Sequence, residues 1–202
     1  MRVIAGEARG TPLRGPRGTA TRPTAARLRE ALFAMLEAAD VDFDWVLDLY
    51  AGSGALGIEA LSRGEGEATF VESDPRAVEA IRENLARTRL QGRAQIAVAR
   101  VERWRPPAGA AYTLVVADPP YHDAAAWDAI EGAVRDALAP HAVVVVEHEA
   151  RGVPPQMLAG RPLWRARRQG AGSVAVYRHS ERHSERPAEP HAEIVAPRED
   201  PQ

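Results

Sequence analysis

The sequence predicts an α/β fold built on a mostly parallel, doubly wound sheet. Short apolar runs, typical of buried strands, alternate at least four times with segments whose apolar residues recur every three or four positions. Glycine-rich turns and an Asp-Pro pair separate them, and both mark junctions between a strand and a helix. Parallel strands joined by helical crossovers follow from this alternation.

Length and composition limit the class of protein. The 202 residues are enough for one domain with a hydrophobic core, and 45% hydrophobic and 27% charged residues are ordinary for a soluble globular chain. No apolar run approaches the ~18 residues of a membrane span, no secretory signal follows Met1, and cysteine is absent. We therefore expect a cytoplasmic protein without disulfides, metal or a membrane partner, and a monomer as the default state.

The N-terminal residues are expected to form a small β-hairpin followed by a helix. Residues 2–6 and 10–14 have the pattern of two short strands joined by a turn. Thr24 is a suitable N-cap, and apolar residues at helical spacing continue from it to about Ala39.

The remaining elements follow in order along the chain. Helices are expected after Gly54, after the Asp74-Pro75 pair and over residues 125–138. Strands are expected at residues 46–49, 68–71, 94–99, 112–117 and 142–146, with a closing antiparallel pair at 161–168 and 173–178. The continuous apolar run at 142–146 indicates a strand buried on both faces.

Three parts of the chain are expected to differ in role. Residues 1–40 would form a basic extension and residues 41–179 the main domain. Residues 180–202 are rich in Pro, Glu and His, repeat the letters R-H-S-E, and are expected to form a disordered tail.

Charge is segregated along the chain despite a net charge of only −2. Residues 1–30 hold seven Arg and two acids, residues 31–150 ten Arg and twenty acids, and residues 151–180 six Arg and no acid. Two basic segments around an acidic middle indicate a polyanion partner. Arginines that merely coat solvated faces would give the same pattern, so charge alone leaves both interpretations open.

A glycine motif identifies a candidate ligand site. Gly52, Gly54 and Gly57 fit the spacing G-x-G-x-x-G between a strand and a helix. Glu72 follows Gly52 by 20 residues, at the end of the next strand, where an acid can accept the ribose hydroxyls of an adenosine. The motif does not separate a nicotinamide dinucleotide from S-adenosylmethionine.

The tetrapeptide Asp118-Pro119-Pro120-Tyr121 separates these two cofactors. It ends the strand at 112–117 and resembles the (D/N)-P-P-(Y/F) signature of methyltransferases that act on planar exocyclic amines. The Asp118 carboxylate and the Pro119 carbonyl can each accept one amine N–H, which holds the nitrogen lone pair toward a methyl donor. Tyr121 can stack on an extruded base.

Longer segments resemble one family closely. They are M-R-V-I-A-G with Arg9-Gly10, then R-P-T at 22–24 and R-L-R-E at 27–30, then the run from Asp48 to Gly64, then V-E-S-D at 71–74 and D-P-P-Y at 118–121. Over about residues 1–178 the chain resembles the RsmD family of bacterial 16S rRNA (guanine-N2)-methyltransferases. The resemblance implies a Rossmann-like class I methyltransferase fold with a seven-stranded sheet, S-adenosylmethionine as cofactor, and one guanine of 16S rRNA in an assembled or nearly assembled 30S particle as target.

The resemblance also implies roles for individual residues. The expected cofactor-binding residues are Arg22, Pro23, Thr24, Asp48, Tyr50, Ala51, Gly52, Ser53, Gly54, Glu72, Ser73 and Arg100. Those expected to position the guanine are Asp118, Pro119, Pro120 and Tyr121. Those expected to contact the RNA are Arg2, Arg9, Arg14, Arg17 and Arg22.

Two other functions and one other RNA surface remain open from the sequence. An adenine-N6 DNA or RNA methyltransferase would share the D-P-P-Y site, and an RNA-binding assembly factor without catalysis would share the basic segments. The RNA surface could instead lie in the second basic segment, at Arg161, Arg165, Arg167 and Arg168.

Overall fold

The structure is a computed structural model that describes residues 1–15, 23–120, 123, 125–169 and 172–179. Its helices are α1 (Pro23–Glu37), α2 (Ala55–Arg63), α3 (Pro75–Thr88), α4 (Ala126–Val134) and the short 3-10 turn η1 (Gln91–Arg93). Its strands are β1 (Trp45–Leu49), β2 (Glu67–Glu72), β3 (Ala94–Val98), β4 (Tyr112–Ala117), β5 (Leu138–Glu149), β6 (Met157–Leu158), β7 (Arg161–Gln169) and β8 (Gly172–Tyr177). The described residues contain no helix long and apolar enough to cross a membrane.

One sheet of eight strands organises the described residues, in the order β3-β2-β1-β4-β5-β8-β7-β6. The first five strands are parallel, while β8, β7 and β6 pair antiparallel. The prediction of seven mostly parallel strands is therefore wrong in number, and the sheet is mixed. The strand that the sequence does not indicate is β6, whose two residues are too few to give a periodic pattern.

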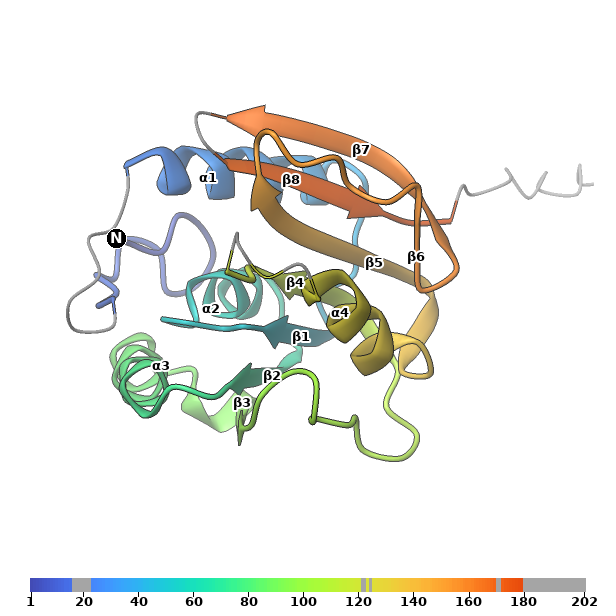
Figure 1. Cartoon of the computed structure of the whole chain (residues 1–202). Helices are drawn as coiled ribbons and strands as arrows, with labels where there is room; N and C mark the ends of the chain where they lie inside the picture. Colours follow the sequence, from blue (N-terminus) through green and yellow to red (C-terminus); the bar gives the residue numbers. More distant parts are fainter. Residues whose placement is uncertain (16–22, 121–122, 124, 170–171, 180–202) are drawn as a thin grey trace, which may run out of the picture.

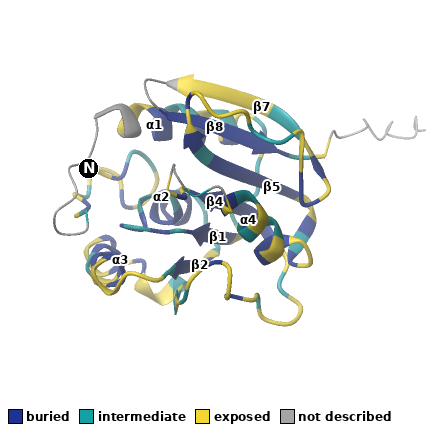
Figure 2. Cartoon of the chain, in the orientation of Figure 1, coloured by how far each residue is buried: buried dark blue, intermediate teal, exposed yellow. Residues whose placement is uncertain are grey.

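Helices cover both faces of the sheet, as predicted (Figure 1). α1, α2 and α3 share one hydrophobic core with Val143 and Val145 of β5, and α4 shares the other with Val144 and Val146. The apolar run of β5 is thus buried on both faces, as its sequence indicates. Figure 2 shows the central strands as the most deeply buried part of the molecule.

The end of α4 corrects a prediction. The helix expected over 125–138 stops at Val134, and Leu138 opens β5 instead. Leu138 pairs with Tyr112 of β4, and the Tyr112 N–H donates to the carbonyl of Ala137 at 2.8 Å. Pro140 follows closely and disfavours a helix before it, so strand pairing overrides the helical spacing.

The N-terminal hairpin is a turn held by few ladder bonds. Val3 N–H donates to the Thr11 carbonyl at 3.0 Å and Gly10 N–H to the Val3 carbonyl at 2.9 Å, but the only isolated bridge there joins Arg2 and Pro12. The two predicted strands therefore reduce to one bridge, because the Thr11 N–H bonds within the turn to the Ala8 carbonyl at 3.1 Å and does not pair with Val3 across the hairpin.

A buried carboxylate attaches this hairpin to α2. Glu59 is fully buried, and its two oxygens accept the N–H groups of Ile4 at 2.9 Å and Ala5 at 3.1 Å. Its charge is balanced by Arg63 at 2.9 Å and Arg29 at 3.8 Å. Since Val3 and Leu13 of the hairpin lie in the same core as α1, α2 and α3, the hairpin packs as part of the fold. The division into parts at residue 40 stays a prediction.

Hydroxyl and glycine contacts reinforce the attachment. The Ser62 hydroxyl donates to the Ala5 carbonyl at 2.6 Å and accepts the Ala8 N–H at 3.0 Å. Gly6 has a φ of +81° and lies so close to α2 that a Cβ there would overlap the Ser62 carbonyl oxygen. Only glycine fits this position.

We predict that Glu59→Ala lowers the free energy of unfolding by about 3 kcal/mol or more, because it leaves two backbone N–H groups and Nε of Arg63 without their acceptor and removes the charge that balances the buried Arg29. Chemical denaturation followed by circular dichroism measures the change.

Glu131→Ala is the matched control. Glu131 pairs with Arg135 at 3.0 Å with the same i,i+4 spacing as Glu59 and Arg63, but on the surface. Its removal should change the free energy of unfolding by less than ~1 kcal/mol. Equal effects of the two variants would contradict the role given to Glu59.

Candidate functional site

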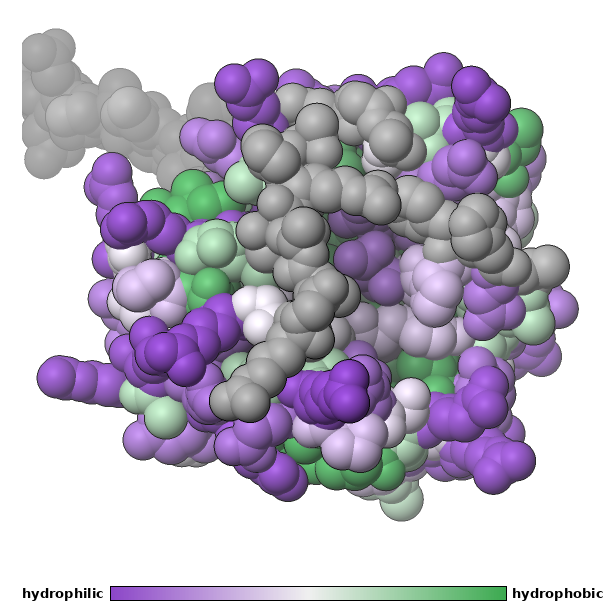
Figure 3. All heavy atoms as spheres, turned by 60° about the vertical axis from the view of Figure 1, so that its left-hand side comes forward, coloured by the Kyte–Doolittle hydropathy of each residue, from purple (hydrophilic) through white to green (hydrophobic). Residues whose placement is uncertain are grey.

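The predicted site residues meet at one edge of the sheet. The strand order reverses between β1 and β4, so the carboxyl ends of these neighbours open a crevice of the kind that binds ligands in α/β proteins. The glycine turn follows β1, Glu72 ends β2, and Asp118 follows β4. Figure 3, which brings the left-hand side of Figure 1 forward, looks onto this edge and shows mostly hydrophilic residues around its rim.

Asp48 of β1 lies at the base of this crevice. It is 1% exposed, and its Oδ2 accepts the N–H of Gly57 in α2 at 2.8 Å. Burial raises the pKa of Asp48 well above its usual value; the Gly57 N–H opposes this rise, and the charges of Asp118 and Glu72 add to it. The acids at the ends of β2 and β4 therefore both act on the carboxyl group of Asp48.

Close packing around the first turn of α2 explains why Gly57, the third glycine of the motif, carries no side chain. A Cβ on Gly57 would lie 2.4 Å from Cε1 of Phe70 and 3.0 Å from Oδ2 of Asp48. These distances leave no room for a side chain, so glycine brings the helix backbone up to the buried carboxylate.

The turn between β1 and α2 has an unusual backbone. Tyr50, Gly52 and Gly54 all have positive φ, at +54°, +56° and +75°. Glycine accepts this conformation, whereas a bulky tyrosine is strained in it. Among the described residues, a Cβ on Gly52 would meet nothing nearer than the Tyr50 carbonyl oxygen at 3.9 Å.

Glu72 orders the turn from the neighbouring strand. Its Oε2 accepts the Gly52 N–H at 2.8 Å, and its Oε1 accepts the N–H groups of Ser73 at 2.7 Å and Asp74 at 2.8 Å. A carboxylate can accept about four hydrogen bonds, so about one position remains for a ligand hydroxyl. Ser73 is exposed beside it.

The strand end at β4 carries the other predicted group. Asp118 is exposed, Pro119 is buried and Pro120 is exposed, and the Asp118 N–H donates to the Leu49 carbonyl at 3.4 Å. This bond continues the β1–β4 ladder by one residue, and it places Asp118 beside the start of the glycine turn. Tyr121 lies outside the described residues.

The loop after β3 approaches Tyr50 from the side. Arg100 is exposed, and its Nε donates to Glu102 at 3.3 Å. Burial raises the pKa of Tyr50 to about 12, and the charges of Glu102 and Asp123 add to the rise. The structure thus brings Arg100 near the tyrosine of the turn, with its guanidinium engaged by Glu102.

Of the predicted RNA-contacting residues, three are described and all three are exposed. Arg2 donates to the Gly10 carbonyl at 3.4 Å, Arg9 lies on the hairpin turn, and Arg14 pairs with Glu83 at 3.3 Å. Arg17 and Arg22 lie outside the described residues. Pro23 and Thr24 form the first turn of α1, so the helix begins two residues earlier than a Thr24 N-cap implies, and nothing of their side chains is described.

Asn84 of α3 is a site residue that the sequence reasoning missed. It is fully buried; its Oδ1 accepts the Arg14 N–H at 2.8 Å, and its Nδ2 donates to the carbonyls of Arg14 at 2.8 Å and Ser53 at 2.9 Å. It therefore joins the end of the hairpin to the glycine turn. A polar residue on the buried face between Ile81 and Leu85 is the signal that could have found it.

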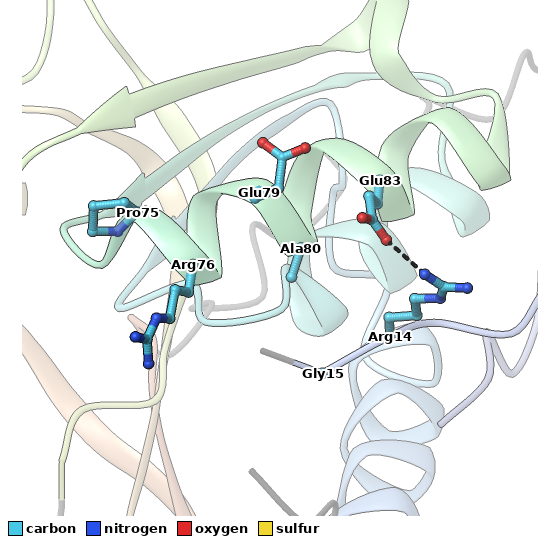
Figure 4. Close-up of a pocket in the computed structure, with 7 residues that line it drawn as sticks. All are labelled: Arg14, Gly15, Pro75, Arg76, Glu79, Ala80 and Glu83. Carbon is cyan, nitrogen blue, oxygen red and sulfur yellow. Dashed lines mark hydrogen bonds and ion pairs between the residues drawn. The ribbon is translucent and has the colours of Figure 1, made fainter. Parts of the chain in front are cut away.

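A pocket of about 480 Å³ opens nearby, between α3 and Arg14-Gly15 (Figure 4). The Arg14–Glu83 ion pair closes one end, and Pro75 and Arg76 form the other. Its lining includes none of the three carboxylates at the strand ends, so we distinguish it from the crevice. No three His, Asp or Glu residues of the described part gather closely enough to hold a metal ion.

Comparison with known sequences gives one family. Residues 1–178 match the family model described as "Conserved hypothetical protein 95". Ribosomal RNA small subunit methyltransferase D of Escherichia coli is 33% identical over 183 residues, which cover 90% of each chain. The protein of the same name from Haemophilus influenzae is 32% identical over 153 residues, covering 74% of this chain and 79% of that protein.

Comparison with solved structures agrees. A chain from Escherichia coli is 33% identical with a TM-score of 0.73, covering 88% of this chain and 97% of that one. A hypothetical protein of Thermus thermophilus is 32% identical with a TM-score of 0.75, covering 89% and 99%. An RNA methyltransferase of Salinibacter ruber in complex with S-adenosyl-L-homocysteine is 19% identical with a TM-score of 0.57, covering 83% and 97%, which supports the Rossmann-like fold alone.

We predict that Asp48→Asn raises the melting temperature at neutral pH. Because burial raises the pKa of Asp48, the folded protein keeps a proton that the unfolded chain releases above about pH 4. The free energy of unfolding that this site contributes is therefore lost as the pH rises from about 4 toward the pKa of Asp48 in the folded protein. The side-chain amide introduced by this change carries no charge and so avoids this loss, while its oxygen can still accept the Gly57 N–H.

Differential scanning fluorimetry at pH 5 and pH 8 measures the effect. The melting temperature of Asp48→Asn minus that of the unaltered protein should be larger at pH 8. Asp128→Asn, an exposed change on α4, is the control and should show no such trend. A difference for Asp48→Asn that is constant with pH would contradict the prediction.

Proposed function

The chain belongs to the RsmD family, and we propose that it methylates the exocyclic N2 amine of one guanine in 16S rRNA, with S-adenosylmethionine as donor. The single observation that carries the proposal is Asp118, which leads the sequence D-P-P-Y at the carboxyl end of β4, beside the glycine turn of β1 and the acid of β2. Family membership over residues 1–178 supports the same chemistry.

The donor set at the strand ends fits S-adenosylmethionine. Glu72 has a remaining lone-pair position for a ribose hydroxyl, and no described side chain crowds Gly52 on the side where a ligand would lie. Tyr50, Ala51, Ser53 and Gly54 would line the methionine part, with Asp48 behind them. Ser73 and Arg100 would border the adenine. Arg22, Pro23 and Thr24 would close over the cofactor.

Asp118 and its neighbours would orient the guanine. When bound, S-adenosylmethionine supplies an electrophilic methyl group on a sulfonium, and it leaves as the thioether. An amine conjugated with a purine is a weak nucleophile, so the Asp118 carboxylate and the Pro119 carbonyl would each accept one of its N–H bonds and direct the lone pair at the methyl carbon. The nitrogen loses a proton as it gains the methyl. Pro120 stiffens the loop, and Tyr121 would stack on the base.

The basic N-terminal segment would hold the RNA. Arg2, Arg9 and Arg14 are exposed on the hairpin, and Arg17 and Arg22 follow in the chain. Glu59 attaches the hairpin to α2, and Asn84 attaches it to the glycine turn. RNA held by the hairpin would therefore lie at a fixed position relative to the cofactor site. A 30S particle or late assembly intermediate is the proposed substrate.

A panel of substrates tests the function. Labelled S-adenosylmethionine is supplied with 30S particles that lack the modification, free 16S rRNA or duplex DNA, and the modified nucleoside is identified by mass spectrometry. N2-methylguanosine from 30S particles is the expected result. N6-methyladenine would support an adenine methyltransferase, and RNA binding without cofactor binding would support a non-catalytic assembly factor.

We predict that Asp118→Ala lowers kcat by more than about a hundredfold while the affinity for S-adenosylmethionine, measured by calorimetry, changes by only a few-fold. Loss of one of two acceptors for the amine removes positioning, which is the main catalytic contribution. Asp136→Ala, on the surface after α4, is the control and should keep full turnover. Survival of turnover in Asp118→Ala would show that the amine is held elsewhere.

We predict that the double change Arg9→Ala and Arg22→Ala weakens RNA binding and reduces its dependence on salt. Each phosphate contact contributes about 0.9 to the slope of log affinity against log salt on a duplex, so two lost contacts lower it by about 2. Filter binding at several salt concentrations gives the slope. An unaltered slope would exclude these arginines from the RNA surface.

A further inference from the structure

The outer strands of the sheet carry a cluster of exposed arginines at the end that faces the crevice. Arg165, Arg167 and Arg168 of β7 are all exposed, and no acid occurs between Glu149 and Glu181. Figure 2 shows the C-terminal half of β7 exposed, next to the buried strand β8. We call these three residues the β7 arginine cluster.

Arg161, at the start of the same strand, has a different role. It is 5% exposed and donates to the carbonyls of Ala142 at 2.9 Å, Ala159 at 3.1 Å and Ala139 at 2.6 Å. Its guanidinium satisfies backbone acceptors at the base of β5, and no surface function remains for it. Of the four arginines that the sequence offers as a second RNA surface, only the β7 arginine cluster is available.

Other exposed arginines of the described residues are paired with acids in part only, and Arg76 and Arg103, for example, have no ion pair, but the cluster brings three unpaired arginines together within four residues of one strand. Arg14, Arg82, Arg100 and Arg135 each pair with a Glu within 4 Å. Among the described residues, none of the three members of the cluster forms an ion pair with an acid. Arg165 instead stacks over Trp164, with 4.4 Å between its guanidinium carbon and the ring centroid. Uncompensated positive charge on a solvated surface attracts a polyanion.

Strand register places the cluster level with the crevice. Ala117, the last residue of β4, pairs with Val146 of β5. One residue further, Glu147 pairs with Val174 of β8, and Val174 pairs with Arg167. Arg167 is therefore level with Asp118 across three strand spacings, or roughly 14 Å at about 4.8 Å each. Figure 1 shows β7 pointing to the same side of the molecule as β5.

The arginines also flank both faces of the sheet at this edge. Arg165 and Arg167 stand opposite Val176 and Val174, whose side chains lie in the core beneath α1. Arg168 stands opposite Ser173 on the α4 side, where its charge acts on His148 of β5. β6 pairs only with the first two residues of β7, so within the described residues no strand covers the outer edge of the cluster.

We propose that the β7 arginine cluster is a second phosphate-binding surface. It binds the rRNA backbone on one side of the target guanine, and the N-terminal hairpin binds the backbone on the other side of that guanine. The proposal rests on the proposed function for its choice of RNA as the polyanion. Arginine suits this task because its planar fork binds phosphate oxygens bidentately. An edge strand also carries charges that prevent pairing with other chains, and the experiment separates that role from RNA binding.

The test compares three triple variants with the unaltered full chain. Arg165→Gln with Arg167→Gln and Arg168→Gln removes the charge, and the corresponding Lys triple keeps it. Arg82→Gln with Arg87→Gln and Arg135→Gln is the matched control. These exposed arginines lie in the C-terminal half of α3 and at the C-terminus of α4, away from the crevice. Affinity for 16S rRNA and for unmodified 30S particles is measured at several salt concentrations, with light scattering to detect self-association.

The Gln triple on β7 should reduce the slope of log affinity against log salt by about 2 to 3, and raise the Kd for RNA at least about tenfold at low salt. Its affinity for S-adenosylmethionine and its kcat at saturating substrate should match the unaltered protein, while its KM rises. The Lys triple should retain most of the slope, and the control triple all of it.

An unaltered slope in the β7 Gln triple, or an equal loss in the control triple, overturns the proposal. Self-association of the Gln triple with unaltered RNA affinity does so too, because it assigns the arginines to edge protection. If the Gln triple self-associates and binds RNA poorly, Arg167→Gln alone decides, with an expected slope change of about 0.9. RNA binding needs no turnover, so these results stand apart from a failure of methyl transfer.

Discussion

The hydrogen bond from the Gly57 N–H to the buried Asp48 carboxylate, at 2.8 Å, is the contact on which the crevice depends. It fixes the first turn of α2 against the end of β1 and so sets the path of the turn between them. Phe70 on β2 packs against the same glycine, and Glu72 two residues later accepts the Gly52 N–H. The turn is thus held by Asp48 of β1 and by Glu72 of β2. Its strained backbone, with positive φ at Tyr50, persists because these contacts over-determine it.

The same turn is connected to the N-terminal hairpin through buried polar groups. Glu59 and Ser62 of α2 hold the hairpin backbone, and Asn84 of α3 bonds both Arg14 and the Ser53 carbonyl. A buried carboxylate that lacked such partners would cost several kcal/mol, so these contacts allow one arrangement of hairpin and turn and disfavour others. A segment that carries exposed arginines is therefore rigidly attached to the element that would bind the cofactor.

Charge is distributed so that the positive groups remain available at the crevice side. Many arginines of the acidic middle of the chain are engaged by glutamates of the same or a neighbouring element. The β7 arginine cluster has no such partners among the described residues, and Arg2 and Arg9 on the hairpin are exposed. A protein with a net charge of −2 can in this way present a basic rim to a polyanion.

The sequence by itself determined the order of the elements, the glycine turn after β1 and the acids at the ends of β2 and β4. These features depend on local periodicity and turn chemistry, which a short segment contains in full. Only the tertiary structure decided that Leu138 joins a strand, that β6 adds an eighth strand, that Arg161 is buried and that Glu59 and Asn84 attach the hairpin. The Glu59 and Asn84 bonds join residues 55 and 70 positions apart, and no local pattern predicts which distant backbone group will need an acceptor.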